Sequence, residues 1–326
     1  MAANTMSFPI LTVIIFLPLA AAIVVAFIPE SDQQLAKTVG FVAALAEIGL
    51  VIALIAAFKV EAGFQFVSRH SWIGEFGIDW NVGVDGISLF LVAMTALLFP
   101  VAMVGPKIRG SARSFMMWML ALEAICMGTF LSLDLFLFFI LFEASLVPAY
   151  FLIAGWGGFR RNYAAMKFFI YTFAGSAFLL VALLAVVFLT APHNGGHETF
   201  DLITLTRLAS SLPHADQELI FAGFAVAFAV KIPVVPFHSW LPDAYTEAPT
   251  AGSMIIAGIL FKLGAYGLLR FGVFMLPRAA VSLAPLLLTL AGIGIVYISI
   301  VTIVQRDFKR LVAYASIVEV ALIVLG

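Results

Sequence analysis

Three charged residues lie deep inside apolar stretches of the chain: Glu143, Lys231 and Lys262. A charge at the centre of a membrane helix costs ~2.5–3.5 kcal/mol on insertion scales, and such residues usually pair with one another or line a path for ions. Burial disfavours a lysine ammonium, whereas a nearby carboxylate favours it, so moving the carboxylate changes whether the lysine holds its proton. We therefore predict proton transfer, with Glu143 paired to Lys231 and Lys262 as the next acceptor along a hydrated line.

Four further residues inside or beside apolar stretches are weaker candidates for the proton path: Glu47, Glu123, His238 and Glu319. Glu123 lies nearer the middle of its stretch, which favours a role in the same path. Glu47 and Glu319 fit a structural pair, or a side chain that reaches the headgroups, as well as they fit a functional role. His238 follows a helix break, where it either relays protons or caps freed carbonyl groups.

The stretch Lys231–Asp243 interrupts the apolar pattern around it. Pro233 and Pro236 each lack a backbone N–H and crowd the carbonyl group four residues earlier. Inside a bilayer, such a break persists only where protein or a water-filled cavity satisfies the freed backbone groups. A broken membrane helix with a charge at the break is typical of an ion or substrate path. Trp240, in the same stretch, fits a packing or interface role.

Composition indicates an integral membrane protein. The chain has 326 residues, of which 63% are hydrophobic and 11% are charged, with a formal net charge of −1. Soluble domains carry about 25% charged residues, and this net charge gives no electrostatic basis for binding nucleic acid. The one cysteine, Cys126, excludes disulfides within the chain and sites held by several cysteines. Scattered histidines, and the lack of a phosphate-binding loop or a GxSxG motif, predict no cofactor, metal or catalytic chemistry in this chain.

Apolar windows of about 20 residues mark membrane-spanning helices. About ten are present, which predicts an all-α polytopic membrane protein with a discontinuous helix near 218–237. The predicted helices cover residues 7–28, 37–58, 86–105, 114–132, 134–155, 164–191, 218–237, 249–274, 282–304 and 309–326. The first window lacks a charged preceding region and a small-residue cleavage site, which indicates a retained helix rather than a signal peptide.

Basic residues gather in alternate loops, which predicts that these loops face the cytoplasm. They are Lys107, Arg109, Arg113, Arg160, Arg161, Lys167, Arg306, Lys309 and Arg310. The intervening segments 59–85 and 192–217 are polar and lean acidic, which places the N-terminus outside. Arg270 and Arg278 are exceptions, because they fall on the outer side. The membrane is expected to be a bacterial plasma membrane, with a mitochondrial inner membrane as the alternative.

Five stretches together resemble the antiporter-like membrane subunits of proton-pumping NADH:quinone oxidoreductase (respiratory complex I), most of all the subunit 4 or chain M type. The longest is KIPVVPFHSWLPDAYTEAPTAGSMIIAGILFKLGAYGLLRF (231–271), in which EAPTAG follows WLPDA. The others are GVDGISL (83–89), DLFLFFILFEASLVPAYFLI (134–153), GWGGFRRNYAAMKFFIYT (155–172) and DFKRLVAYASI (307–317).

The resemblance implies a proton-translocating subunit of the membrane arm that has no redox centre of its own. Its partners would be other membrane-arm subunits and the lipid bilayer, and FMN, iron–sulfur clusters and quinone would belong to partner subunits. It also implies roles by position. Glu143 would be the carboxylate partner, Lys231 would lie on the broken helix, and Lys262 would be the central lysine. The secondary positions are Glu123, Lys167 and His238.

Family members are longer and contain two inverted repeats. We therefore expect residues 1–105 to form N-terminal helices and an outer loop, 106–275 a first five-helix repeat with its broken helix, and 276–326 the start of an incomplete second repeat. The apolar C-terminal end leads us to expect a truncated chain. Two positions depart from the family pattern. Tyr245 stands where histidine is usual, and Val318-Glu319 stand where serine and histidine are usual.

Two alternatives to a complex I subunit stay open from the sequence. Subunits of multi-subunit sodium/proton antiporters share much of the same pattern. A structural membrane scaffold is the third reading, but it would bury six charges, at the positions discussed above, for packing alone.

Overall fold

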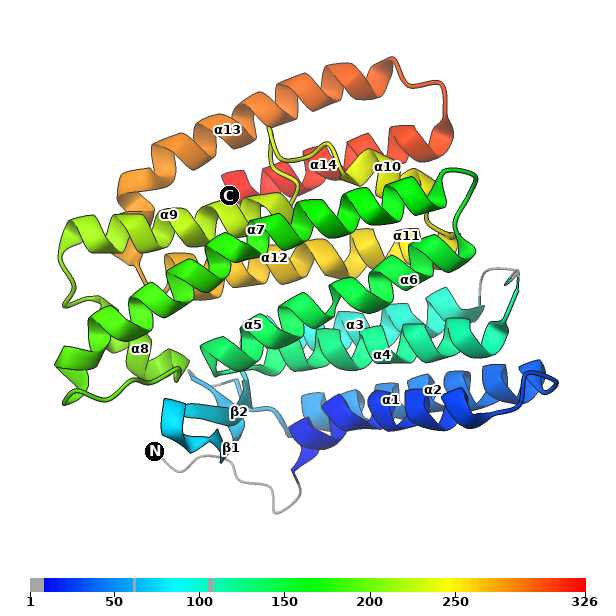
Figure 1. Ribbon diagram of the computed structural model, residues 1–326, viewed down its shortest axis with the longest axis horizontal. Helices are drawn as coiled ribbons and strands as arrows, with labels where there is room; N and C mark the ends of the chain where they lie inside the picture. Colours follow the sequence, from blue (N-terminus) through cyan, green and yellow to red (C-terminus); the bar gives the residue numbers. More distant parts are fainter. Residues whose placement is uncertain (1–8, 61–62, 105–107, 109) are drawn as a thin grey trace.

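The computed structural model describes residues 9–60, 63–104, 108 and 110–326. Glu61, Lys107 and Arg109, which enter the loop-charge prediction, lie outside the described residues. The long helices lie side by side with nearly parallel axes, and a small hairpin of strands lies at one end of the bundle (Figure 1). This arrangement confirms the predicted class of polytopic helical membrane protein.

Most helices follow one another in the order of the predicted apolar windows, and two short ones, α8 (Leu202–Ala209) and α10 (Leu241–Glu247), lie outside these windows. Those of the first half are α1 (Ile10–Phe27), α2 (Gln33–Ala57), α3 (Gly86–Val104), α4 (Ala112–Leu131), α5 (Leu135–Ala144), α6 (Leu146–Trp156) and α7 (Arg161–Thr190). Those of the second half are α8 (Leu202–Ala209), α9 (His214–Lys231), α10 (Leu241–Glu247), α11 (Thr250–Ile255), α12 (Phe261–Gly267), α13 (Pro277–Ile303) and α14 (Phe308–Leu325). Helices α1 and α2 lie at one edge of the bundle and α13 at the other (Figure 1).

Most of these helices are apolar around their whole circumference, as expected for helices in lipid or in a buried core. Eight helical segments of the described chain are long and apolar enough to cross a membrane. Helices α9 and α14 are not among the eight, because each carries several charges within 18 residues. These charges are Asp216, Glu218 and Lys231 on α9, and Lys309, Arg310 and Glu319 on α14.

Short polar side chains begin several helices, because they accept hydrogen bonds from free backbone N–H groups of the first turn. Ser111 accepts from the N–H of Ser114 at the start of α4. Asp134 accepts from the first residues of α5, and Asp201 does the same for α8. These caps fix where the chain leaves each loop and enters the bundle.

Segment 59–85, which the sequence indicated only as a polar outer connection, contains a β-hairpin. Strands β1 (Gln65–Ile73) and β2 (Ile78–Val84) pair antiparallel. Gly77 closes the turn with φ 66°, and a Cβ at this position would lie 2.5 Å from the carbonyl oxygen of Glu198. The Asn81 Nδ2 group donates to Asp201 Oδ1 at 2.9 Å. The hairpin is therefore joined to the segment 192–217, the other outer connection.

Three predicted windows are interrupted in the structure. The predicted discontinuity near 218–237 is confirmed, and the continuous helix α9 already ends at Lys231. The window 134–155 is divided at Ser145 into α5 and α6, which the sequence analysis did not predict. The window 249–274 contains two π-helical segments, η3 (Ile256–Leu260) and η4 (Leu268–Val273). π-Helical turns inside α-helices occur frequently at functional sites.

Candidate functional site

The end of α9 is a break whose backbone groups are satisfied inside the protein. The N–H of Val234 donates to the Ala229 carbonyl at 2.9 Å, past Pro233, which has no N–H to offer. The indole Nε1 of Trp240 donates to the Val230 carbonyl at 2.9 Å. Trp240 is buried, as its predicted packing role requires, and its hydrogen bond to the break was not foreseen. The chain thus leaves the helix without leaving these two carbonyl groups unpaired.

Lys231 is the last residue of α9 and is only 2% exposed. Its Nζ donates to the hydroxyl oxygen of Ser145 at 3.3 Å. The same Nζ lies 4.6 Å from the centre of the Phe142 ring, a distance at which the ring face attracts a cation. Ser145 is the residue between α5 and α6, and its own hydroxyl donates to the Phe142 carbonyl at 2.6 Å. Two interrupted helices therefore meet at the Lys231 ammonium.

Glu143 belongs to the last turn of α5, two residues before Ser145. It lies within electrostatic range of Lys231, and the pairing of the two stays a prediction. The two do not form a direct ion pair within 4.0 Å, since the ion pairs found among the described residues join other groups. Lys231 is therefore held by a neutral hydroxyl, with the carboxylate acting from a greater distance.

Close helix packing places the break against α12. A Cβ on Gly264 would lie 2.8 Å from Ile232 Cγ1 and 3.2 Å from Lys231 Cβ. On the other side, a Cβ on Gly175 of α7 would lie 2.9 Å from Val230 Cβ. Glycine at these two positions lets α7 and α12 approach the end of α9 to a distance that any larger residue would prevent.

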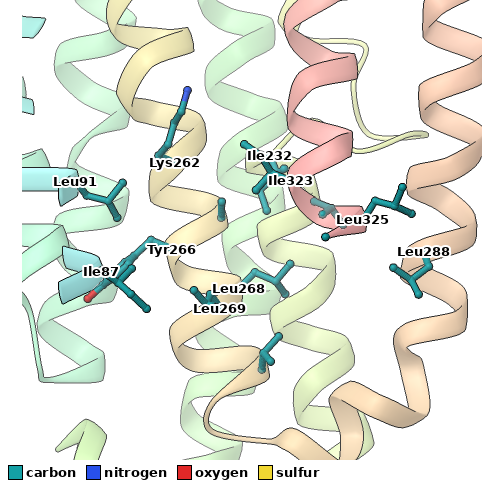
Figure 2. Close-up of a pocket in the computed structure, with 14 residues that line it drawn as sticks. Ile87, Leu91, Ile232, Lys262, Tyr266, Leu268, Leu269, Leu288, Ile323 and Leu325 are labelled. Carbon is teal, nitrogen blue, oxygen red and sulfur yellow. The ribbon is translucent and has the colours of Figure 1, made fainter. Parts of the chain in front are cut away.

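Lys262 lies on α12, directly after the π-helical segment η3. Its Nζ donates to the Ala257 carbonyl, five residues earlier, at 2.6 Å. The side chain also lines a pocket of about 620 Å³ together with Ile232, Tyr266 and Ile323. Figure 2 shows the ammonium pointing along the helix and away from the apolar residues of the pocket. Lys262 interacts electrostatically with Glu319 of α14. No hydrogen bond or ion pair of the described residues joins Lys262 to Lys231 or Glu143.

Two of the secondary candidates lie around α10 and the break. The Nζ of Lys167 forms an ion pair with Asp243 Oδ2 at 2.7 Å, and Arg310 binds Asp243 Oδ1 at 3.0 Å. Lys167 thus ties α7 to α10 and, through Asp243, to α14. The His238 ring lies edge-on to Tyr297 of α13, with the ring centres 5.9 Å apart.

Glu123, the third secondary candidate, is completely buried on α4. Its electrostatic partner there is Glu47 of α2. The structure therefore places Glu123 beside a second acid.

Arg270, one of the two exceptions to the predicted pattern of loop charges, has a specific partner. Arg270 is 6% exposed and binds Asp85 Oδ2 at 2.7 Å. Its guanidinium also lies 5.1 Å from the centre of the Tyr266 ring. Burial acts to raise the pKa of Asp85, but hydrogen bonds from Ser88 and Arg270 and the charge of Arg270 bring it below its ordinary value. Arg270 is therefore a structural residue, and the orientation of the chain in the membrane stays a prediction.

The pKa of Asp134, an acid near the β-hairpin, changes in the opposite direction to that of Asp85. Burial raises the pKa of Asp134 to about 6, although backbone N–H groups of Leu137, Asp79 and Phe136 donate to its carboxylate and act to lower it. Asp134 caps α5 and so holds the helix that carries Glu143. The β-hairpin is thereby connected to the site by the backbone of α5.

The sequence signals found the charged residues of this site but not the neutral ones. Ser145 and Trp240 carry the hydrogen bonds that organise Lys231 and the break. Pro148 is a signal that predicts the interruption at Ser145, because its ring crowds the carbonyl group of Ala144 and it lacks an N–H.

An apolar helical bundle with a buried lysine, and with a half-buried acid and a second half-buried lysine nearby, at an interrupted helix defines a class of membrane proteins that move ions through charged residues. The chain belongs to the NADH:quinone oxidoreductase/Mrp antiporter transmembrane family, whose model matches residues 132–326. This region contains Glu143, Lys231 and Lys262. The expected family is therefore confirmed.

Individual relatives agree with this assignment. The chain is 38% identical over 324 residues to NADH-quinone oxidoreductase subunit M of Rickettsia prowazekii, with 98% of this chain and 65% of the relative covered. It is 40% identical over 326 residues to NAD(P)H-quinone oxidoreductase chain 4 1 of a Nostoc species, with 99% of this chain and 59% of the relative covered. The chain thus spans less than two thirds of the length of these two relatives.

Solved structures share the fold. One chain of respiratory complex I from Thermus thermophilus superposes with a TM-score of 0.84 at 28% identity, covering 96% of this chain and 63% of the other. One chain of the Mrp complex from a Dietzia species superposes with a TM-score of 0.79 at 24% identity, covering 97% of this chain and 34% of the other. The second likeness concerns the fold alone.

Proposed function

We propose that the chain is a proton-translocating subunit in the membrane arm of an NADH:quinone oxidoreductase and has no redox centre of its own. The observation that carries this proposal is the burial of Lys231 where broken helix α9 meets the interruption between α5 and α6. The names of the relatives from Rickettsia and Nostoc support the choice of complex. FMN, iron–sulfur clusters and quinone would then belong to partner subunits, and the other membrane-arm subunits would be neighbours.

In this proposal the proton moves along Glu143, Lys231 and Lys262. Glu143 favours the charged ammonium of Lys231 when it is close, and desolvation favours proton release when the carboxylate moves away. The Ser145 hydroxyl suits both states, because its oxygen can accept a hydrogen bond from the ammonium or from an N–H of the neutral amine while its own proton is donated to the Phe142 carbonyl. Water near the break would carry the proton on to Lys262.

The secondary candidates have different parts in the proposal. Lys167 is a positioning residue, because its ion pair with Asp243 holds α7 against α10. His238 lies beyond the break and is proposed as a relay, because its buried Nδ1 has no hydrogen-bond partner among the described residues. The division of the chain into 1–105, 106–275 and 276–326 stays a prediction, as do the bacterial plasma membrane and the outer N-terminus.

The test is NADH-driven acidification of vesicles that contain the assembled complex. Wild-type complex is expected to acidify the vesicle interior on adding NADH, and Glu143→Gln is expected to reduce the acidification and the quinone reductase rate together. Assembly is checked by the flavin content of the purified complex. Normal acidification by a fully assembled Glu143→Gln complex would contradict the proposal.

A subunit of a multi-subunit sodium/proton antiporter is the second candidate. The observation in its favour is the fold shared with a chain of the Mrp complex. A sodium pulse without NADH separates the two candidates, because an antiporter changes the vesicle pH in response to sodium alone. Copurification with flavin and iron–sulfur proteins is expected only for the oxidoreductase.

A further inference from the structure

Glu47 on α2 and Glu123 on α4 are two acids that the proposed proton line does not use. Both residues are 0% exposed. All four of their carboxylate oxygens are buried and lack a hydrogen-bond partner among the described residues. The two acids interact electrostatically across the contact between α2 and α4. They form a buried pair of acids without a visible donor or cation.

Apolar helices surround the pair. Helices α1 and α3, which pack on both α2 and α4, contain no titratable side chain. Helices α2 and α4, which carry the two acids, also contain Lys37 and Arg113 near their N-terminal ends. The other elements that pack on α4 carry the titratable side chains of Asp79, Glu143, Tyr150, Lys262 and Tyr266. In the part of the chain that the structure describes, none of these side chains donates a hydrogen bond to either acid.

Two ionised carboxylates are strongly unfavourable in such a place, because burial and mutual repulsion both oppose charge. Acid pairs that share a buried site therefore keep a proton on at least one member. A metal cation is a poor alternative occupant, because hard cations take six or more oxygen ligands. The described residues contain no group of three or more His, Cys, Asp or Glu side chains that could hold a metal.

We propose that Glu47 and Glu123 form a proton-binding carboxylate pair that holds at least one exchangeable proton between α2 and α4. The pair lies outside residues 132–326, the stretch matched by the family model. The inference rests on the burial and the missing partners of the two acids. It holds whether or not the complex pumps protons through Lys231.

The acid pair is also near enough to the broken helix to affect the charge around Lys231. Cys126 lies on α4 three residues after Glu123 and is completely buried. Its neutral thiol lies within electrostatic range of both Glu123 and Lys231. Gain or loss of the proton on the pair changes the charge on this side of Lys231, so the pair can act as a proton store beside the main line.

The test is infrared difference spectroscopy on the intact complex purified from its host membrane, with the Glu47→Gln/Glu123→Gln double variant subtracted from wild type. At neutral pH we expect wild type to contain a protonated-carboxyl band that shifts in D₂O and is lost in the double variant. Each single glutamine variant should shift this band, because it replaces one acid and so changes the electrostatic surroundings of the other. Glu75→Gln, at an exposed glutamate, should leave the band unchanged.

Two results would overturn the inference. One is a wild-type spectrum that loses no protonated-carboxyl signal in the double variant, because both acids would then be ionised. The other is a band that disappears when sodium is added at constant pH, because the occupant would then be a cation. Should the double variant fail to assemble, the single variants decide by the same band, which must shift in both. These readouts do not depend on proton pumping, so failure of the proposed function would not change them.

Discussion

The Lys231 ammonium donates a hydrogen bond to the Ser145 hydroxyl at 3.3 Å, and this contact joins two helix interruptions. Lys231 ends α9, and Ser145 separates α5 from α6. Glu143 stands two residues before Ser145, so any movement at the α5–α6 junction changes the distance from the carboxylate to the ammonium. The junction is therefore the part of the fold that can couple a helix movement to the proton on Lys231.

Ser145→Ala tests the neutral partner of Lys231. Hydrogen bonds to charged groups contribute about 1.5–3 kcal/mol, so the loss should lower the NADH-driven proton flux of the assembled complex by roughly tenfold or more. Ser145→Thr retains the hydroxyl and serves as the matched control. Equal flux in wild type and Ser145→Ala would remove the hydroxyl from the mechanism.

Gly264→Ala tests the close approach of α12 to the break. The added Cβ would lie 2.8 Å from Ile232 Cγ1, so α12 or the break must shift. Overpacking of this kind costs about 1–3 kcal/mol, which should appear as a lower thermal midpoint of the purified protein. Gly292→Ala is the control, because no heavy atom lies within 4 Å of a Cβ there. An unchanged midpoint for Gly264→Ala would show that α12 does not pack as described.

Asp85→Asn leaves the buried Arg270 without its carboxylate. Breaking a buried pair by removing one partner costs about 3–5 kcal/mol. Asp79→Asn is the control, because its partner Arg69 is 54% exposed and exposed pairs contribute at most about 1 kcal/mol. Thermal unfolding at pH 7 should separate the two variants. Similar midpoints would contradict the structural role of Arg270.

The ion pair of Asp85 and Arg270 also predicts that the stability of the protein depends on pH. The pKa of Asp85 is lower in the folded protein than its ordinary value. Its contribution to the free energy of unfolding is therefore present at neutral pH and lost as the pH falls through the folded pKa. Acid titration of the thermal midpoint should show a decline in wild type that is smaller in Asp85→Asn. A decline of equal size in both would assign the acid sensitivity to other groups.

Trp240→Phe tests the cap of the broken helix. The phenyl ring fills much of the space but leaves the buried Val230 carbonyl without its donor, at a cost of about 1–3 kcal/mol. Trp72→Phe, at an exposed tryptophan, is the control. Reduced stability is expected for the first variant only. Equal stability of both variants would mean that another group satisfies the carbonyl.

Much of the fold follows from the sequence, because lipid requires long apolar helices and prolines end them. The predicted windows therefore match the observed helices, and the break after Lys231 lies where Pro233 and Pro236 require it. The β-hairpin was not predicted, because strand pairing depends on contacts between segments far apart in the chain. Asn81 and Asp201 supply one such contact.

The site was only partly predictable. Charged residues in apolar stretches are conspicuous, so Glu143, Lys231 and Lys262 could be selected directly as candidates. Their neutral partner, Ser145, has no such signature, because serine is common in membrane helices. The Glu47–Glu123 pairing also depends on the packing of α2 on α4, which no local pattern encodes.

The most direct test of the central claim is the number of protons moved per NADH by a complex that carries Lys231→Met. Methionine fills similar space but cannot hold a proton, so we expect fewer protons per NADH than in wild type, with the complex still assembled. Lys59→Met, at an exposed lysine, should pump as wild type does. A wild-type ratio in an assembled Lys231→Met complex would contradict a role for Lys231 in proton transfer.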